Sequence, residues 1–157
     1  MQKIAPCLWF NFNAEEAVNH YVGIFKQSRI LHTSYYGEEL PDLAGKALMI
    51  EFELEGQRFQ ALNGGLGFPF TQAISLSVDC VDQVEVNSLW QALCEGGAEV
   101  QCGWLKDKFG LSWQIVPHRF VEMMQAPDQA AVARVMQAMF TMTRLDVAKL
   151  ETAFRGG

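Results

Sequence analysis

An internal sequence repeat limits which folds this chain can adopt. The segments GQRFQAL, beginning at Gly56, and GLSWQIV, beginning at Gly110, both read Gly-x-x-aromatic-Gln-apolar. Each segment follows a strand, a helix and further strand signals, so the two halves of the chain share one order of elements. Such self-similarity predicts two copies of one module, and each copy places a glutamine, Gln60 or Gln114, four residues after a turn glycine.

Hydrophobic periodicity predicts one helix in each half. Asn13 has the position of an N-cap, with Glu16 three residues later, as in a capping box. Asp82 and Glu85 lie in the first turn of the second helix, where the helix dipole favours negative charge. Apolar residues then recur at helical spacing in both segments: Val18, Tyr21, Val22 and Phe25, and Val86, Leu89, Trp90 and Leu93.

Helical patterns replace strand patterns after Pro117. HRFVEMMQAP predicts a short helix, Asp128 caps a longer one, and DVAKLETAF predicts a last helix. We expect the apolar face of the longer helix to pack in a core or interface, and it comprises Val132, Val135, Met136, Met139 and Phe140. The sequence thus predicts a single domain with a first module at 1–63, a linker at 64–72, a second module at 73–117 and a helical tail at 118–157.

Strand alternation separates the residues that face the helices from those that face elsewhere. In the second module, Ile74, Leu76 and Val78 share one face with Leu111, Trp113 and Ile115 of the later strand. The opposite face carries the polar residues Ser75, Ser77, Ser112 and Gln114. We expect the apolar face to cover the helix and the polar face to line a cavity.

The two hairpins refine this assignment. If the second hairpin turns at Asp107–Gly110 with the same number of residues on each strand, Trp104 lies opposite Trp113 on the core face. Gly103 then lies opposite Gln114, and its missing side chain leaves space in front of the amide. Equal arms about Glu55–Gly56 place Phe52 opposite Phe59 on the core face. On the other face they place Glu51 opposite Gln60 and Glu53 opposite Arg58. The last pair predicts a cross-strand ion pair, and Glu51, if partly enclosed, is a candidate general base.

Charge and composition exclude several classes of partner. The chain has 12 basic and 18 acidic side chains, a net charge of −6, and no basic stripe, which argues against nucleic acid. No segment is apolar enough to span a bilayer, and the amino-terminal apolar run is too short for a signal peptide. The four cysteines contain no C-x-x-C pair, which favours buried, reduced thiols in a cytoplasmic protein.

The two modules resemble the vicinal oxygen chelate superfamily, which includes glyoxalase I, extradiol dioxygenases and bleomycin or fosfomycin resistance proteins. CLWFNFNAEEAVNHYVGIF, EFELEGQRFQALNGG and QCGWLKDKFGLSWQIVP resemble its PhnB-like group, often labelled 3-demethylubiquinone-9 3-methyltransferase domain. The resemblance implies an α+β fold: two βαβββ modules forming curved mixed sheets around a cavity, with a C-terminal helical extension here. It also implies a homodimer.

In metal-using relatives, the resemblance places ligands on the first and fourth strands of each half. The matching positions here are Pro6, Gln60, Ala73 and Gln114. Proline and alanine offer no side-chain donor, and neutral amides are weak ligands beside carboxylate or imidazole. We therefore expect no metal at this site, although a divalent ion bound with the help of Glu51 remains an alternative.

Two further features bear on chemistry. His20, His32 and His118 share no ligand spacing, so we expect structural or surface roles for them, with His32 bordering the cavity at most. NGGLGFPF, residues 63–70, is the only glycine-rich candidate for a nucleotide-type site, but no helix pattern opens after it. It is interpreted as part of the linker.

These observations favour a small-molecule binding protein with no cofactor. Gln60, Ser75, Ser77, Ser112 and Gln114 would contact the ligand, and apolar residues such as Leu8 and Phe10 would bury it. The alternative is a lyase, isomerase or dioxygenase that uses Glu51 or a divalent metal. Methyl transfer, which the group's label names, ranks last.

Overall fold

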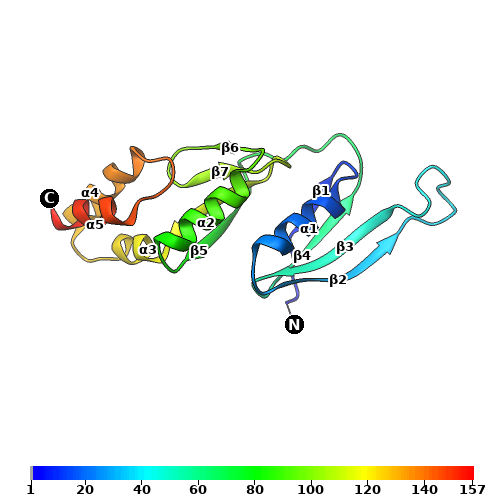
Figure 1. The fold of residues 1–157 in the computed structure, drawn as a ribbon, viewed down its shortest axis with the longest axis horizontal. Coiled ribbons are helices and arrows are strands. Elements are labelled where there is room, and N and C mark those ends of the chain that lie inside the picture. The colour runs from blue at the N-terminus through cyan, green and yellow to red at the C-terminus, as the bar shows by residue number, and fades with distance from the viewer. Residues whose placement is uncertain (1) are drawn as a thin grey trace. The chain divides into compact units, whose positions relative to one another are not determined.

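The computed structural model describes residues 2–157, which form two compact units, residues 2–69 and 70–157. Each unit contains one four-stranded sheet with a helix packed on one face, and the second unit carries three more helices (Figure 1). This is the α+β architecture with a helical extension that the sequence predicts. The two sheets are separate and neither is closed.

The first unit follows the predicted order of elements. Its sheet has the order β1-β4-β3-β2, with β1 parallel to β4 and the other neighbours antiparallel. Its elements are β1 (Cys7–Phe10), α1 (Ala14–Ile24), β2 (Ser28–Tyr35), β3 (Ala47–Leu54) and β4 (Gln57–Asn63).

Helix α1 begins where Asn13 predicts, but a different asparagine satisfies its first turn. The side chain of Asn13 makes no capping hydrogen bond. Instead, the Ala14 amide donates to Asn63 Oδ1 at 3.0 Å, and Asn63 Nδ2 donates to the Ala47 carbonyl at 3.1 Å. Asn63 is 2% exposed. A buried side chain of β4 therefore joins the helix start to β3.

The second unit repeats the same strand order, β5-β8-β7-β6, with β5 parallel to β8. Asp82, expected in the first turn of the helix, is the N-cap of α2, and its carboxylate accepts a hydrogen bond from the Glu85 amide at 2.9 Å. The predicted apolar stripe of α2 is buried. The elements are β5 (Ser75–Cys80), α2 (Gln83–Cys94), β6 (Ala98–Glu99), β7 (Trp104–Lys106) and β8 (Ser112–Pro117).

The first hairpin has the predicted register. Phe52 pairs with Phe59 and Glu51 pairs with Gln60 across β3 and β4. The two phenylalanine rings stack with centroids 5.4 Å apart and are buried beneath α1. The turn residues Glu55 and Gly56 both have positive φ, at 49° and 81°, as a tight two-residue hairpin requires.

The second hairpin departs from the predicted register by one residue. Trp104 pairs with Gln114, and Leu105 pairs with Trp113. The loop is longer than equal arms allow because Asp107 organises it: its backbone amide donates to the Leu111 carbonyl, and its Oδ1 accepts from the Leu111 amide at 3.0 Å. A shift of one residue moves a side chain to the opposite face of a strand. Trp113 is therefore in the core, as predicted, and Trp104 is not.

Gly103 also differs from its predicted role. It donates its amide to the Thr143 carbonyl at 2.7 Å and accepts a hydrogen bond from the Ile115 amide at 2.8 Å. Its φ is +83°, and a Cβ there would lie 2.9 Å from Leu145 Cγ. Gly103 makes room for the C-terminal extension and does not lie opposite Gln114.

The extension forms a small core of its own within the second unit. Its helices are α3 (His118–Met124), α4 (Gln129–Phe140) and α5 (Val147–Arg155), and Asp128 caps α4 as predicted. Its core contains Met123, Val135, Met142, Leu145 and Leu150. The predicted packing face of α4 is partly wrong, because Phe140 is 60% exposed and Ala131 is buried instead.

The extension is also tied to α2. The Gln83 side chain donates to the Leu145 carbonyl at 3.0 Å and accepts from the Val147 amide at 2.7 Å. Across residues 2–157, no helix is sufficiently long and apolar to cross a bilayer.

Candidate functional site

Each sheet has a face covered by its helix and an opposite face on which polar side chains lie. We call the latter the polar face. In the second unit, Leu105, Trp113 and Ile115 are buried beneath α2. Strand alternation places the remaining side chains on the polar face: Ser75, Ser77, Asp79, Trp104, Lys106, Ser112, Gln114 and Val116.

Gln114 lies at the centre of the polar face of the second unit. It pairs with Ser77 of β5 on one side and with Trp104 of β7 on the other. Its Nε2 donates to Ser75 Oγ at 2.9 Å. Ser77 is exposed, whereas Ser75, Trp104 and Gln114 are half-buried. The predicted polar residues Ser75, Ser77 and Gln114 are thus brought together, with an indole that the sequence assigned to the core.

Ser112 occupies the same face but differs in accessibility. It pairs with Ser75 of β5 and with Lys106 of β7. Only 2% of the residue is exposed. Ser112 therefore lies beneath its neighbours, where a ligand would reach it only after they move.

The polar face of the first unit carries the corresponding row. Gln60 pairs with Cys7 of β1 and with Glu51 of β3, and Glu51 pairs with His32 of β2. One residue from each strand therefore forms a row of histidine, glutamate, glutamine and cysteine. Within the row, Glu51 in this unit corresponds to Trp104 in the other.

The ion pairs of this face differ from the predicted one. Arg58 Nη2 donates to Glu51 Oε1 at 2.6 Å, and Arg29 pairs with Glu53 at 3.1 Å. Arg58 lies opposite Glu53 in register but reaches diagonally to Glu51. The side chains of Arg58 and Glu51 are 32% and 28% exposed. Glu51 thus combines partial burial with a charge-assisted hydrogen bond that engages one of its oxygens.

Leu8 and Phe10 do not line the polar face, contrary to prediction. They pair with Ala61 and Asn63 on the face covered by α1 and are 5% and 2% exposed. The apolar residue that β1 places on the polar face is Trp9. Its Nε1 donates to the Gly65 carbonyl at 2.9 Å, and Phe68 meets its ring edge-on at 4.8 Å.

The register also corrects the positions expected for metal ligands. Pro6 and Ala73 precede strands β1 and β5, and Cys7 and Ser77 are the residues that lie beside the two glutamines. Amide, hydroxyl and a single thiol make a poor donor set for a catalytic divalent ion, which normally has three strong protein ligands. In the described part of the chain, no three His, Cys, Asp or Glu side chains cluster as metal ligands would.

The four cysteines are free thiols, but they are not uniformly buried as predicted. Cys80 is buried, Cys94 and Cys102 are half-buried, and Cys7 is exposed. Burial raises the pKa of Cys80 to about 12 and that of Cys94 to about 11, so both are thiols at neutral pH. Neither is a nucleophile, because thiolate is the reactive form.

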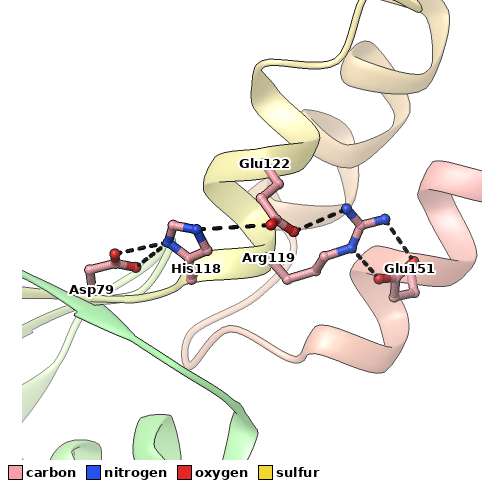
Figure 2. Close-up of polar contacts among 5 residues, drawn as sticks. All are labelled: Asp79, His118, Arg119, Glu122 and Glu151. Carbon is pink, nitrogen blue, oxygen red and sulfur yellow. Dashed lines mark hydrogen bonds and ion pairs between the residues drawn. The ribbon is translucent and has the colours of Figure 1, made fainter.

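A charged cluster at the end of the polar face of the second unit was not predicted from the sequence. His118 Nδ1 lies 2.9 and 3.1 Å from the two carboxylate oxygens of Asp79, as Figure 2 shows. Asp79 follows Ser77 on the same face of β5. The hydrogen bond to Asp79 raises the pKa of His118 above its ordinary value, and the charges of Asp79 and Glu122 act in the same direction.

The cluster continues through α3 to α5. Glu122 Oε1 lies 3.9 Å from His118 Nε2, and Glu122 Oε2 lies 3.3 Å from Arg119 Nη1. Arg119 also donates to Glu151, and this ion pair lowers the pKa of Glu151. Acidic and basic residues alternate from β5 to α5 (Figure 2). The contacts to Asp79 and Glu151 join residues 39 and 32 positions apart in the chain, and no local pattern signals them.

Comparison with known proteins supports the same fold. The family model described as 3-demethylubiquinone-9 3-methyltransferase matches residues 2–116. A putative protein of that description, the PhnB protein from Bacillus cereus, is 36% identical, with a TM-score of 0.68 over 74% of this chain and 99% of its own. No curated protein matches the chain.

Two more distant structures show the fold alone. Protein PA1353 from Pseudomonas aeruginosa is 21% identical, with a TM-score of 0.62 over 74% of this chain and 98% of its own. The fosfomycin resistance protein FosX from Listeria monocytogenes, in complex with Mn(II) and sulfate, is 13% identical, with a TM-score of 0.52 over 73% of this chain and 92% of its own. The match over residues 2–116 and the 36% identity to the PhnB protein place the chain in the 3-demethylubiquinone-9 3-methyltransferase family, the PhnB-like group.

Proposed function

We propose that this protein binds a small organic ligand without a metal, and that Gln114 is the main polar contact. The observation that carries the proposal is the position of Gln114 on the polar face, between Ser77 and Trp104 and bonded to Ser75. One amide N–H and the carbonyl oxygen of Gln114 remain for a ligand. Trp104 offers apolar surface beside them, and this combination is typical of small-molecule sites.

Gln60 occupies the corresponding position in the first unit, with Cys7 and Glu51 as neighbours. We include it in the proposal as a second polar contact. A cavity that Gln60 shares with Ser75, Ser77, Ser112 and Gln114 stays a prediction from the sequence. The cytoplasmic location and the homodimer stay predictions as well, and four free thiols are consistent with a reducing compartment.

FosX was solved with Mn(II). We propose that the site of this protein holds no metal, because its side-chain donors differ from those that bind divalent ions well. Gln60 and Gln114 hold the central positions of their rows, and their amide oxygens bind divalent ions weakly beside carboxylates. The proposal predicts no stoichiometric metal in the purified protein by elemental analysis. It also predicts no change of melting temperature when Mn²⁺ or Zn²⁺ is added.

The second candidate is lyase, isomerase or dioxygenase chemistry at Glu51. The specific observation in its favour is the cross-strand pair His32 and Glu51, which sets an imidazole beside a carboxylate, with Gln60 as the next residue in the row. Methyl transfer receives no such support, because residues 63–70 lead into β5 and not into a helix.

A comparison of three proteins tests the binding proposal. Wild type, Gln114→Ala and Gln91→Ala would be purified identically, and small molecules retained by each would be identified by native mass spectrometry. Gln91 is exposed on α2 and serves as the matched control. We expect wild type and Gln91→Ala to retain the same compound and Gln114→Ala to lose most of it. Equal retention by all three proteins, or a stoichiometric divalent metal in wild type, would refute the proposal.

A further inference from the structure

The charged cluster described above joins three elements of the second unit. Asp79 belongs to β5, His118, Arg119 and Glu122 belong to α3, and Glu151 belongs to α5 (Figure 2). Each contact is an ion pair or a charge-assisted hydrogen bond. The cluster is the only direct polar side-chain link described between β5 and α3 within residues 2–157.

The two links in the cluster differ in how they respond to pH. Arg119 joins α3 to α5 through Glu151, and a guanidinium keeps its charge at any pH at which the protein is folded. His118 joins α3 to β5 through Asp79, and an imidazole changes charge near neutral pH. Only the link between α3 and β5 therefore depends on a proton in the physiological range.

The groups that face His118 define its electrostatic environment. Asp79 approaches from β5 and Glu122 from the next turn of α3. Arg119, the next residue along α3, is held between Glu122 and Glu151, so its charge is directed toward those carboxylates. His118 thus lies between two acidic groups, one at each ring nitrogen, and both favour the imidazolium form.

We propose that protonated His118 fastens the start of the C-terminal extension to β5, and that loss of this proton loosens α3 from β5 while α3 stays attached to β8 and α5. The proton binds at His118, the Nδ1–H donates to Asp79, and the charge attracts Glu122. The neutral ring keeps at most a weaker hydrogen bond to Asp79, and no longer attracts Glu122. Asp79 is two residues from Ser77, so release alters the end of the polar face.

The direction of the effect follows from proton linkage. The pKa of His118 is higher in the folded protein than its ordinary value of 6.5, chiefly because of the hydrogen bond to Asp79. The folded state therefore holds the proton more tightly than the unfolded chain does. The stabilisation is fully present below pH 6.5 and is lost as the pH rises through the higher, folded-state pKa.

The first experiment titrates His118 by NMR. The chain has three histidines, so a His118→Gln variant identifies the His118 resonance by its absence. We expect wild-type His118 to titrate above 6.5, Asp79→Asn to lower this pKa most, and Glu122→Gln to lower it less, because Asp79 accepts the hydrogen bond. His118 titrating at 6.5 in wild type, or unchanged by Asp79→Asn, would overturn the proposal.

The second experiment measures release by amide hydrogen exchange, corrected for the intrinsic effect of pH. In wild type, protection of the amides at the end of α3, including Gln125, should fall several-fold as the pH rises through the measured pKa. Protection of α5 should not follow the same transition. In His118→Gln, the protection of α3 and of α5 should not change over this pH range. The control is His32→Gln, which alters an exposed histidine of the first unit and should show the same loss of α3 protection as wild type. Constant α3 protection in wild type would refute the release, and the result does not depend on whether a ligand binds.

Discussion

Trp104 and Trp113 lie on opposite faces of one sheet, although they come from adjacent antiparallel strands. Trp113 pairs with Leu105 in the core, and Trp104 pairs with Gln114 on the polar face. The indole of Trp113 donates to the buried carboxylate of Asp107 at 2.8 Å. One tryptophan is therefore part of the core, and the other is half-buried on the polar face.

Truncating the two tryptophans should separate these roles. Trp113→Ala removes a side chain that is 2% exposed and should lower the free energy of unfolding by roughly 3–5 kcal/mol. Trp104→Ala removes a half-buried side chain and should cost about 1 kcal/mol. Urea denaturation followed by circular dichroism measures both. Similar losses for the two variants would contradict the assignment of faces.

Gly103 should tolerate no side chain. Gly103→Ala introduces left-handed strain of about 1–2 kcal/mol and a Cβ that meets Leu145. Gly45→Ala is the matched control, because Gly45 has nearly the same φ, +82°, and nothing within 4 Å of its Cβ position. Thermal denaturation should show a larger loss for Gly103→Ala. Equal losses would mean that the contact with Leu145 is not restrictive.

Asp107 should be the residue that fixes the second hairpin. Its carboxylate accepts hydrogen bonds from the Phe109 and Leu111 amides and from Trp113 Nε1, and it is 2% exposed. Asp107→Ala leaves these donors without that partner and should cost about 3 kcal/mol or more. The exposed Asp42, changed to alanine, should shift stability by no more than about 0.5 kcal/mol. A small effect of Asp107→Ala in chemical denaturation would show that the backbone alone sets the loop.

Asn63 should be needed for the start of α1. Asn63→Ala removes a buried acceptor for Ala14 and a buried donor to Ala47, at roughly 2–4 kcal/mol. Asn63→Asp keeps the acceptor but sets a carboxylate oxygen against the Ala47 carbonyl, and should also be destabilising. Asn19→Ala, at an exposed position of the same helix, should be nearly neutral. If Asn63→Asp unfolds at the same urea concentration as wild type, the bond to Ala47 contributes little.

The features that the sequence predicted correctly are local ones. Asp128 caps α4 through amides within three residues of itself, Glu85 lies in the first turn of α2, and the two-residue Glu55–Gly56 turn joins strands in the expected register. The register of the second hairpin was predicted wrongly, because a buried side chain, Asp107, enlarges the loop by one residue. Because side chains alternate along a strand, this shift of one residue moves Trp104 to the polar face and moves Gly103 away from Gln114.

The contacts that could not be predicted join residues far apart in the chain. Asn63 replaces Asn13 at the start of α1 from 49 residues away, and Asp79 meets His118 from 39 residues away. Local patterns specify which residues share a face of a strand, and they placed Ser75, Ser77 and Gln114 together. They do not specify which partner reaches across from another element.

The close approach of Leu145 to Gly103 has a consequence for the family. The match to the family model covers residues 2–116 and ends before α3. Leu145 therefore lies outside the matched region. In a homologue without the extension, no residue equivalent to Leu145 would meet a Cβ at the position of Gly103. The appended helices therefore add a steric demand at Gly103 to the conformational demand that its positive φ already makes.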